Sequence, residues 1–516
     1  MSNVDLIPVL LIAVPIMAAI APIALGLRYQ RTGWSIAAVT TTGLFAASVY
    51  LASVVYGDNS SVTHQLGDFP PQYGIELVAD PLSMLIVLLV TTIAAAVLAL
   101  TRLGGPRGNV FYSGYLLLTG GLLGLALTGD VFNMFVFLEI VGLGTYALIS
   151  SGDGPESAVA ALKYLILGTT GASMYLIGVA FLFMATGTLN MVELADLLQG
   201  SGLDQQQLSL VRTAFAFIFV GFSIKVAQWP LHTWQPDAYQ HAPDGVTPLI
   251  AALVSTVSAY ALGRILFDVF GPEFLIQTPY VKEILVTVGS ISVIAGSTLA
   301  VIQQDVKRML AYSSVSQFGL VIAAYGVVTE TAFTGAIIHL VGHGVMKAGL
   351  FAAAAVVSLG YGARTVNEYA GLAKNRPVSA AGMAVLLVAL VGIPPSAGFV
   401  GKWYIALGAV EAQAWPVAAV IFLSTMFTLA YAARLLEKMY FTPAADSGPH
   451  RSDGNPAASQ MATDGGNDGR ASATPDAVSI GMIVFVVGLA GIAVGFGFAG
   501  GALFELLEPF AEEVFN

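Results

Sequence analysis

The sequence contains no cysteine, and only 10% of its 516 residues are charged. Without cysteine the chain forms no disulfide, binds no thiolate-held iron–sulfur cluster and uses no cysteine nucleophile. Soluble domains carry about 25% charged residues, so the scarcity of charge excludes an ordinary soluble fold. The six histidines lack zinc-site spacing, and the net charge of −11 argues against binding to nucleic acid. We therefore expect no metal, no cofactor and no nucleic-acid partner.

Apolar length is what the chain has in abundance. Hydrophobic residues make up 56% of the sequence, and the mean hydropathy is +0.80. Apolar runs of about 18 residues or more recur, each long enough to cross a ~30 Å hydrocarbon core as a helix. We predict an all-α polytopic membrane protein with about fourteen transmembrane helices. The predicted helices cover residues 5–27, 34–56, 79–101, 111–129, 131–150, 157–186, 208–230, 246–268, 279–302, 308–328, 331–359, 379–411, 414–436 and 477–501.

The chain divides by composition into membrane blocks and one polar linker. Residues 442–476 are rich in Gly, Ser, Asp, Pro and Ala, a composition that cannot bury enough apolar surface to order itself. We interpret this segment as a flexible cytoplasmic loop. The predicted blocks are 1–110 (helices 1 to 3), 111–270 (helices 4 to 8), 279–436 (helices 9 to 13), the loop 442–476, and 477–516 (helix 14 with an acidic C-terminus).

Basic residues alternate between successive loops. Cytoplasmic loops carry an excess of Lys and Arg, so the alternation predicts a multi-pass cell-membrane protein with both termini outside. Three basic residues depart from the pattern: Arg212, Arg264 and Lys282. The residues that follow it are Arg28, Arg31, Arg102, Arg107, Lys307, Arg308, Arg364, Lys374, Arg376, Arg434, Lys438 and Arg451.

Two membrane segments combine a lysine with a proline break. Lys225 lies just before Pro230 in helix 7, and Lys402 follows Pro394 and Pro395 in helix 12. A proline removes a backbone donor and ends or bends a helix, so both helices are predicted to be broken. The order of lysine and proline is reversed between the two, as expected for inverted repeats at helices 4–8 and 9–13. A lysine beside freed carbonyls forms a polar position in the membrane, although Lys225 could instead extend toward an interface.

A carboxylate lies in the middle of helix 5. Glu139 is surrounded by apolar residues, and a charge at this depth costs about 2.5–3.5 kcal/mol to insert. It is either a proton-binding acid or one half of a structural ion pair. Lys163, in the first third of helix 6, is a spare partner for Glu139 or a lysine that reaches the interface.

Three titratable residues recur along helix 11. His339, His343 and Lys347 follow an i, i+4, i+8 spacing, which places them on one face. Histidine titrates near pH 6.5 and can relay protons. Buried histidines also serve as plain hydrogen-bonding groups, but three titratable groups in a row favour proton transfer.

These stretches resemble the antiporter-like subunits shared by respiratory complex I and Mrp-type cation/proton antiporters, and most of all the D-type member of the Mrp antiporters. The resemblance implies fourteen helices, inverted five-helix repeats, a Glu139–Lys225 pair, a terminal Lys402 and a hydrophilic axis on helix 11. It also implies a multi-subunit assembly that moves protons and Na⁺. The matching stretches are FNMFVFLEI, AALKYLILG, KVAQWPLHTWQPDAYQHAP, QQDVKRMLAYSSVSQFGL, HLVGHGVMKAGLF and GIPPSAGFVGKWY.

The chain departs from that family at two positions. Thr256 stands where the family usually has a lysine on helix 8, and Gln317 where a histidine often follows the serines of helix 10. Hydroxyls and amides hold water but carry no charge at neutral pH. The relay between the two repeats would then run through water, be weakened, or serve a different ion.

Three functions remain open on the sequence alone. The first is the proton-translocating subunit of a Na⁺/H⁺ antiporter, a transporter subunit without its own redox centre. The second is a proton-pumping subunit of a complex I-like or hydrogenase-like assembly. The third is a membrane scaffold in which the charges only pair with one another. The proton-transfer residues in the first two hypotheses are Glu139, Lys163, Lys225, His339, His343, Lys347 and Lys402.

Overall fold

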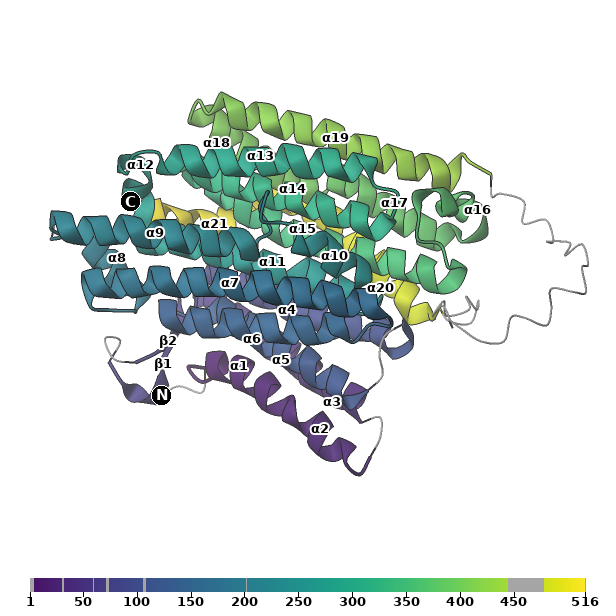
Figure 1. The fold of residues 1–516 in the computed structure, drawn as a ribbon, viewed down its shortest axis with the longest axis horizontal. Coiled ribbons are helices and arrows are strands. Elements are labelled where there is room, and N and C mark those ends of the chain that lie inside the picture. Colours follow the sequence, from purple (N-terminus) through teal and green to yellow (C-terminus); the bar gives the residue numbers. More distant parts are fainter. Residues whose placement is uncertain are drawn as a thin grey trace, which may run out of the picture.

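The computed structural model describes residues 4–29, 32–58, 60–70, 74–104, 108–200, 202–443 and 478–515. Most helices lie side by side along the long axis of the molecule (Figure 1). Thirteen spans of the described residues are long and apolar enough to cross a membrane. Two shorter helices, α17 (Pro377–Val391) and α18 (Ala397–Glu411), follow one another in the second half of the chain. The prediction of an all-α polytopic membrane protein is confirmed, apart from one two-stranded sheet.

The long helices agree with the predicted ones to within a few residues at most ends. Those of the first half are α1 (Ile7–Ala18), α2 (Ile20–Gly26), α3 (Gly33–Asp58), α4 (Pro81–Gly104), α5 (Asn109–Leu127), α6 (Val131–Ser150), α7 (Pro155–Thr186), α9 (Gln205–Lys225) and α11 (Thr247–Arg264). Those of the second half are α13 (Val281–Ile302), α14 (Val306–Val327), α15 (Glu330–Tyr361), α17 (Pro377–Val391), α18 (Ala397–Glu411), α19 (Trp415–Tyr440) and α20 (Ile480–Phe498).

Several short elements were not predicted. They are strands β1 (Val62–Gln65) and β2 (Glu76–Ala79), the short helices α8 (Met191–Gln199), α10 (Trp234–His241), α12 (Gly271–Gln277) and α16 (Leu372–Asn375), the 3₁₀ turns η1 (Leu66–Asp68) and η3 (Val366–Tyr369), the π-helical turn η2 (Ile265–Phe270), and the C-terminal helix α21 (Gly500–Phe515). The acidic C-terminus is therefore helical. Arg31, Arg107, Arg451 and the loop predicted at 442–476, except its first two residues, lie outside the described residues.

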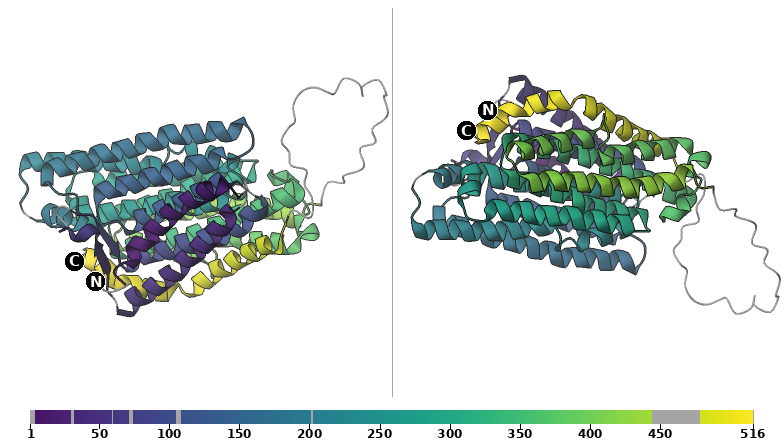
Figure 2. Two further views of the ribbon diagram at one scale, coloured as in Figure 1. Left: turned by 90° about the horizontal axis from the view of Figure 1, so that it is seen from below. Right: turned by 90° about the horizontal axis from the view of Figure 1, so that it is seen from above.

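Strands β1 and β2 form an antiparallel hairpin at one end of the bundle, which we call the hairpin end. Both labelled ends of the chain lie there, and α16 lies at the opposite end (Figures 1 and 2). The two termini thus share one side, as the charge pattern predicted. Which side of the membrane that is stays a prediction.

Two similar bridges tie the ends of helices together. Asp130, which caps the start of α6, pairs with Asn190 next to the hairpin, and Asp305, which caps the start of α14, pairs with Thr365 toward α16. In each case the segment before a helix pairs with the segment after the next long helix. Inverted repeats would produce such a pair of bridges at opposite ends. The predicted repeats, and the blocks drawn from them, stay a prediction that this geometry supports.

The core of the bundle lies around three helices, α11, α14 and α15. The apolar windows of α14 and α15 are completely buried, whereas those of α7, α13 and α19 are buried over 39% of their residues. Because the apolar window of α15 is completely buried, the titratable residues on it lie inside protein and not against hydrocarbon. This position makes α15 the axis around which the candidate site is arranged.

Candidate functional site

The first broken helix consists of α9 and α10. Pro230 lacks the N–H that would bond to the carbonyl of Val226 four residues earlier, so the helix cannot continue through it. Helix α9 ends at Lys225. Beside the break, the carbonyl of Ile224 accepts a hydrogen bond from the indole N–H of Trp234 at 2.8 Å. The predicted break is confirmed, and it leaves Lys225 at its edge.

The structure brings Glu139 of α6 and Lys225 of α9 together. Lys225 Nζ lies 3.9 Å from Glu139 Oε1 and donates to the Leu138 carbonyl at 3.4 Å. The lysine side chain is almost completely buried, and that of Glu139 is 26% exposed. A carboxylate and an amine in this position can share a proton or form an ion pair. The geometry agrees with the predicted pairing, while its part in transport stays a prediction.

Lys163 of α7 has a different partner from the one considered on the sequence. Its Nζ lies 2.6 Å from Asp237 Oδ2 on α10, and Arg308 at the start of α14 donates to Asp237 Oδ1 at 2.8 Å. Asp237 therefore joins three helices through two cations. Sequence reasoning missed Asp237, although its place in the polar stretch after a membrane proline was a usable signal.

The second broken helix consists of α17 and α18. The donors that would bond to the carbonyls of Leu390 and Val391 belong to Pro394 and Pro395, which have no N–H. Lys402 replaces them, since its Nζ donates to the Leu390 carbonyl at 3.3 Å and the Val391 carbonyl at 3.0 Å. The break is confirmed, and a buried ammonium group lies across it.

Three residues on one face of α15 form what we call the α15 row: His339, His343 and Lys347. Each of them is at most 1% exposed. His339 Nε2 lies 3.0 Å from Gln317 Oε1, so the amide that replaces the expected histidine is its hydrogen-bond partner. The rings of His339 and His343 are 6.3 Å apart between centroids, and Phe318 lies edge-on to His343. The predicted shared face is confirmed.

Lys347 is held without a carboxylate. Its Nζ donates to the Leu310 carbonyl at 2.7 Å and to the Ser313 hydroxyl on α14. None of the ion pairs in the described part of the chain includes Lys347. A buried amine that hydrogen bonds without an opposite charge is poised to lose or gain a proton.

Lys402 lies next to the α15 row. A Cβ added at Gly401 would lie 2.5 Å from His339 Cβ, so the backbones of α18 and α15 touch at this position. Only glycine permits that approach. Lys402 and the α15 row thus lie together on two helices in close contact.

Further buried polar groups lie on α11 and in the first break. The Thr256 hydroxyl on α11 and both amide atoms of Gln228 in the first break have no hydrogen-bond partner among the described residues, and both residues are buried. Buried polar atoms of this kind are satisfied by water. The amides of Gln228 and Gln235 were missed on the sequence, where only the lysine and proline of that stretch were weighed.

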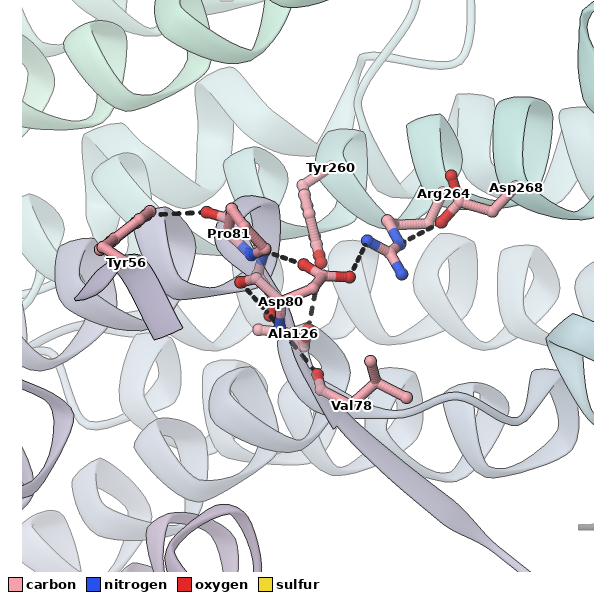
Figure 3. A network of polar contacts seen from close by, with 9 residues as sticks. Tyr56, Val78, Asp80, Pro81, Ala126, Tyr260, Arg264 and Asp268 are labelled. Atoms are coloured by element: carbon pink, nitrogen blue, oxygen red, sulfur yellow. Dashed lines mark hydrogen bonds and ion pairs between the residues drawn. The ribbon is translucent and has the colours of Figure 1, made fainter. Parts of the chain in front are cut away.

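Arg264, at the end of α11, is held between two aspartates at the hairpin end (Figure 3). Its Nη1 lies 2.5 Å from Asp80 Oδ2 and its Nε 2.5 Å from Asp268 Oδ2. Its guanidinium also lies over the Phe510 ring of α21. The network joins α4, α11, η2 and α21, which gives Arg264 a structural reason to lie at this end against the predicted charge pattern.

An ion pair fixes the segment between α10 and α11, where Asp244 lies outside the membrane spans. Lys307 Nζ lies 3.0 Å from Asp244 Oδ1 and donates to the Ala242 carbonyl at 2.9 Å. Burial raises the pKa of Asp244, but Lys307, together with Arg364 and Ser358, outweighs this effect, and the pKa lies below its ordinary value. The pair links this segment to the start of α14.

Replacing Asp244 with Asn is expected to remove a pH-dependent part of the stability. Because the folded-state pKa lies below the unfolded value of about 3.9, the ionised group stabilises the fold above about pH 4, and this is lost in stronger acid. Thermal melting of the purified protein should show a wild-type advantage over Asp244→Asn near pH 7 that shrinks below pH 4. An advantage that stays constant or grows in acid would contradict this prediction.

Together these groups can carry a mobile charge by electrostatics alone. Protonating one buried group changes the stability of charge on its neighbours, because interactions in a low-dielectric interior are strong. Among the described residues, no cluster of three or more His, Asp or Glu side chains is placed to hold a metal ion. The Lys, His and Glu side chains that are present can take part in acid–base chemistry.

Comparison with known proteins matches the chain to one family. The model of the family described as NADH:quinone oxidoreductase/Mrp antiporter, TM, matches residues 128–428. The chain is 39% identical to the N subunit of NADH-quinone oxidoreductase from Desulforudis audaxviator, over 84% of this chain and 86% of that one. It is 29% identical to the D subunit of the Na⁺/H⁺ antiporter from Bacillus subtilis, over 83% and 85%. A chain of the Mrp complex from Dietzia superposes with a TM-score of 0.87 at 26% identity, covering 100% of this chain and 98% of that one.

Proposed function

Because the chain belongs to the NADH:quinone oxidoreductase/Mrp antiporter family of membrane proteins, we propose that it is the proton-translocating subunit of a multi-subunit Na⁺/H⁺ antiporter. One observation carries the proposal. The Glu139–Lys225 pair, the α15 row and Lys402 place six titratable groups inside the bundle, at two helix breaks and between them. Charges at that depth are energetically unfavourable, so their presence there points to a functional site.

The mechanism follows from the cost of burying charge. A proton that reaches Glu139 neutralises the carboxylate and leaves Lys225 without its counter-charge. Lys225 then becomes a better proton donor, and the change passes on toward the α15 row. Lys402 lies beside His339 and forms the last group of this series in the second break. Lys163 pairs with Asp237 of α10, so it contributes to proton transfer by holding α10 in position.

The partners of the chain are inferred from its relatives, and its location from the distribution of basic residues. Solved structures that the chain resembles include the Mrp complex of Dietzia and a membrane-bound sulfane sulfur reductase, so we place this chain in a multi-subunit membrane assembly. The relative from the Na⁺/H⁺ antiporter of Bacillus subtilis supports Na⁺ as the exchanged cation. We assign the assembly to the cell membrane with both termini outside, from the basic loops. The chain acts as a transporter subunit and contributes no redox centre of its own.

A second function is favoured by a specific observation. The identity to an NADH-quinone oxidoreductase subunit, 39%, exceeds the 29% to the antiporter subunit. In that case the same buried groups would move protons driven by electron transfer in neighbouring subunits. The structural match to the Mrp complex supports the antiporter.

One experiment separates these functions. The complex purified through a tag on this chain is reconstituted into vesicles that enclose a pH-sensitive dye. A jump in external Na⁺ without electron donor or acceptor is expected to change the internal pH, with choline chloride as the control. Proton movement only upon quinone reduction would establish the second function instead. No proton movement under either condition would favour a scaffold.

A further inference from the structure

A set of neutral side chains lies between the first break and α15, where the chain has Thr256 and no charged residue. Gln235 of α10 is completely buried, and its Nε2 donates to Ser255 Oγ at 3.0 Å and to the Tyr239 hydroxyl at 3.1 Å. The Ser255 hydroxyl in turn donates to the carbonyl of Lys225 at 3.3 Å. These contacts connect α10 and α11 to the edge of the break.

The other end of this set reaches α15. The ring of Tyr239 packs edge-on against Phe351 with 5.6 Å between centroids. Phe351 follows Lys347 by four residues, so Tyr239 lies against the face that carries the α15 row. Both Ser255 and Tyr239 are at most 1% exposed. The set thus extends from the Lys225 carbonyl at the first break to Phe351, one helical turn beyond Lys347 on α15.

The direction of the hydrogen bonds gives Gln235 a specific role. An amide NH₂ has two protons to donate, and here one goes to each hydroxyl oxygen. Each hydroxyl therefore keeps its own proton for a bond that points away from Gln235. A hydroxyl that accepts on one side and donates on the other can pass a proton with water and bear no lasting charge.

We propose that Gln235 is a positioning residue that holds Ser255 and Tyr239 as a neutral proton link between the Glu139–Lys225 pair and the α15 row. The inference rests on the proposed function and specifies how its two halves communicate. Thr256, one residue after Ser255, is buried with an unpartnered hydroxyl among the described residues, which marks a second polar atom on the same stretch of α11.

The test uses exchange by the reconstituted complex. Tyr239→Phe removes one hydroxyl and Gln235→Leu removes the amide at similar size, and each is expected to lower the rate at least about tenfold, as for other lost proton-transfer groups. Two matched controls lose buried hydroxyls outside the link: Tyr325→Phe, whose hydroxyl bonds to Ala259, and Ser258→Ala, whose hydroxyl bonds within α11. Both are expected to keep exchange within about twofold, well short of a lost proton-transfer group.

A third variant separates proton transfer from packing. Gln235→Glu keeps the shape but adds an ionisable group. The protonated acid can still donate to one of the two hydroxyls, so exchange should be higher in acid and fall as the pH rises, when a carboxylate can no longer donate. A pH profile equal to that of the wild type, with full rates for Tyr239→Phe and Gln235→Leu, would overturn the link.

Glu139→Gln is measured in parallel to keep the two proposals apart. If Glu139→Gln loses exchange while the link variants keep it, only the link fails. If Glu139→Gln also keeps full exchange, the proposed function fails with it. Should Gln235→Leu not assemble into the complex, Tyr239→Phe decides the outcome.

Discussion

Replacing Lys225 with Met is expected to lower Na⁺-dependent proton exchange on the order of 100-fold, the usual scale for loss of a proton-transfer group. The amine is buried at the edge of the first break and lies 3.9 Å from Glu139. Without it, protonation of Glu139 has no neighbouring ammonium group whose proton it can release. The rate of internal pH change after a Na⁺ jump measures the effect in vesicles that contain the assembled complex.

Removing the amine alone also leaves Glu139 without its counter-charge, which is expected to destabilise the chain by about 3–5 kcal/mol if the carboxylate stays ionised. The double variant Glu139→Gln/Lys225→Met removes both charges and should recover much of that stability but none of the exchange. Lys374→Met, at an exposed position, is the matched control and should exchange normally. Recovery of exchange in the double variant would show that the pair is only structural.

The sequence was sufficient for features that depend on local chemistry. Apolar length defined the membrane helices, and Pro230 and the Pro394–Pro395 pair defined both breaks, because a missing N–H acts on a carbonyl four residues away. The α15 row followed from helical periodicity. The pairing of Glu139 with Lys225 came from resemblance and from the rule that buried charges need partners, and the structure agrees with it.

Features that depend on distant segments could not be predicted in this way. Lys163 and Asp237 are 74 residues apart in the chain, and Arg308 approaches the same carboxylate from 71 residues away. No periodicity connects such positions. The hairpin was missed because its strands have only four residues each, too few for a visible alternation.

The three buried lysines differ in what their removal leaves behind, and this difference sharpens the mechanism. Removing Lys225 leaves a carboxylate. Removing Lys402 leaves the carbonyls of Leu390 and Val391, whose usual donors are prolines. Removing Lys347 leaves no group unpaired, because the Leu310 carbonyl also accepts hydrogen bonds from the hydroxyls of Ser313 and Ser314.

Lys347→Met is therefore expected to abolish exchange and at the same time make the protein more stable. The amine bears the cost of desolvation without an opposite charge, and Met fills a similar volume with an apolar chain. Replacing buried ionic groups by well-packed apolar ones can stabilise by about 1–4 kcal/mol. Thermal melting of the complex should rise for Lys347→Met and fall for Lys402→Met, while both lose exchange.

This pair of variants distinguishes a transport residue from a structural one. Removing a structural lysine lowers the stability and the function of the protein together. Removing a lysine that is retained for ion movement abolishes function but raises stability, because the buried amine was unfavourable. Lys402 combines both roles, so it serves as the internal comparison. If Lys347→Met were to melt earlier than the wild type, or to exchange protons at the normal rate, then Lys347 would be a packing residue and only the two histidines of the α15 row would remain as proton-transfer groups.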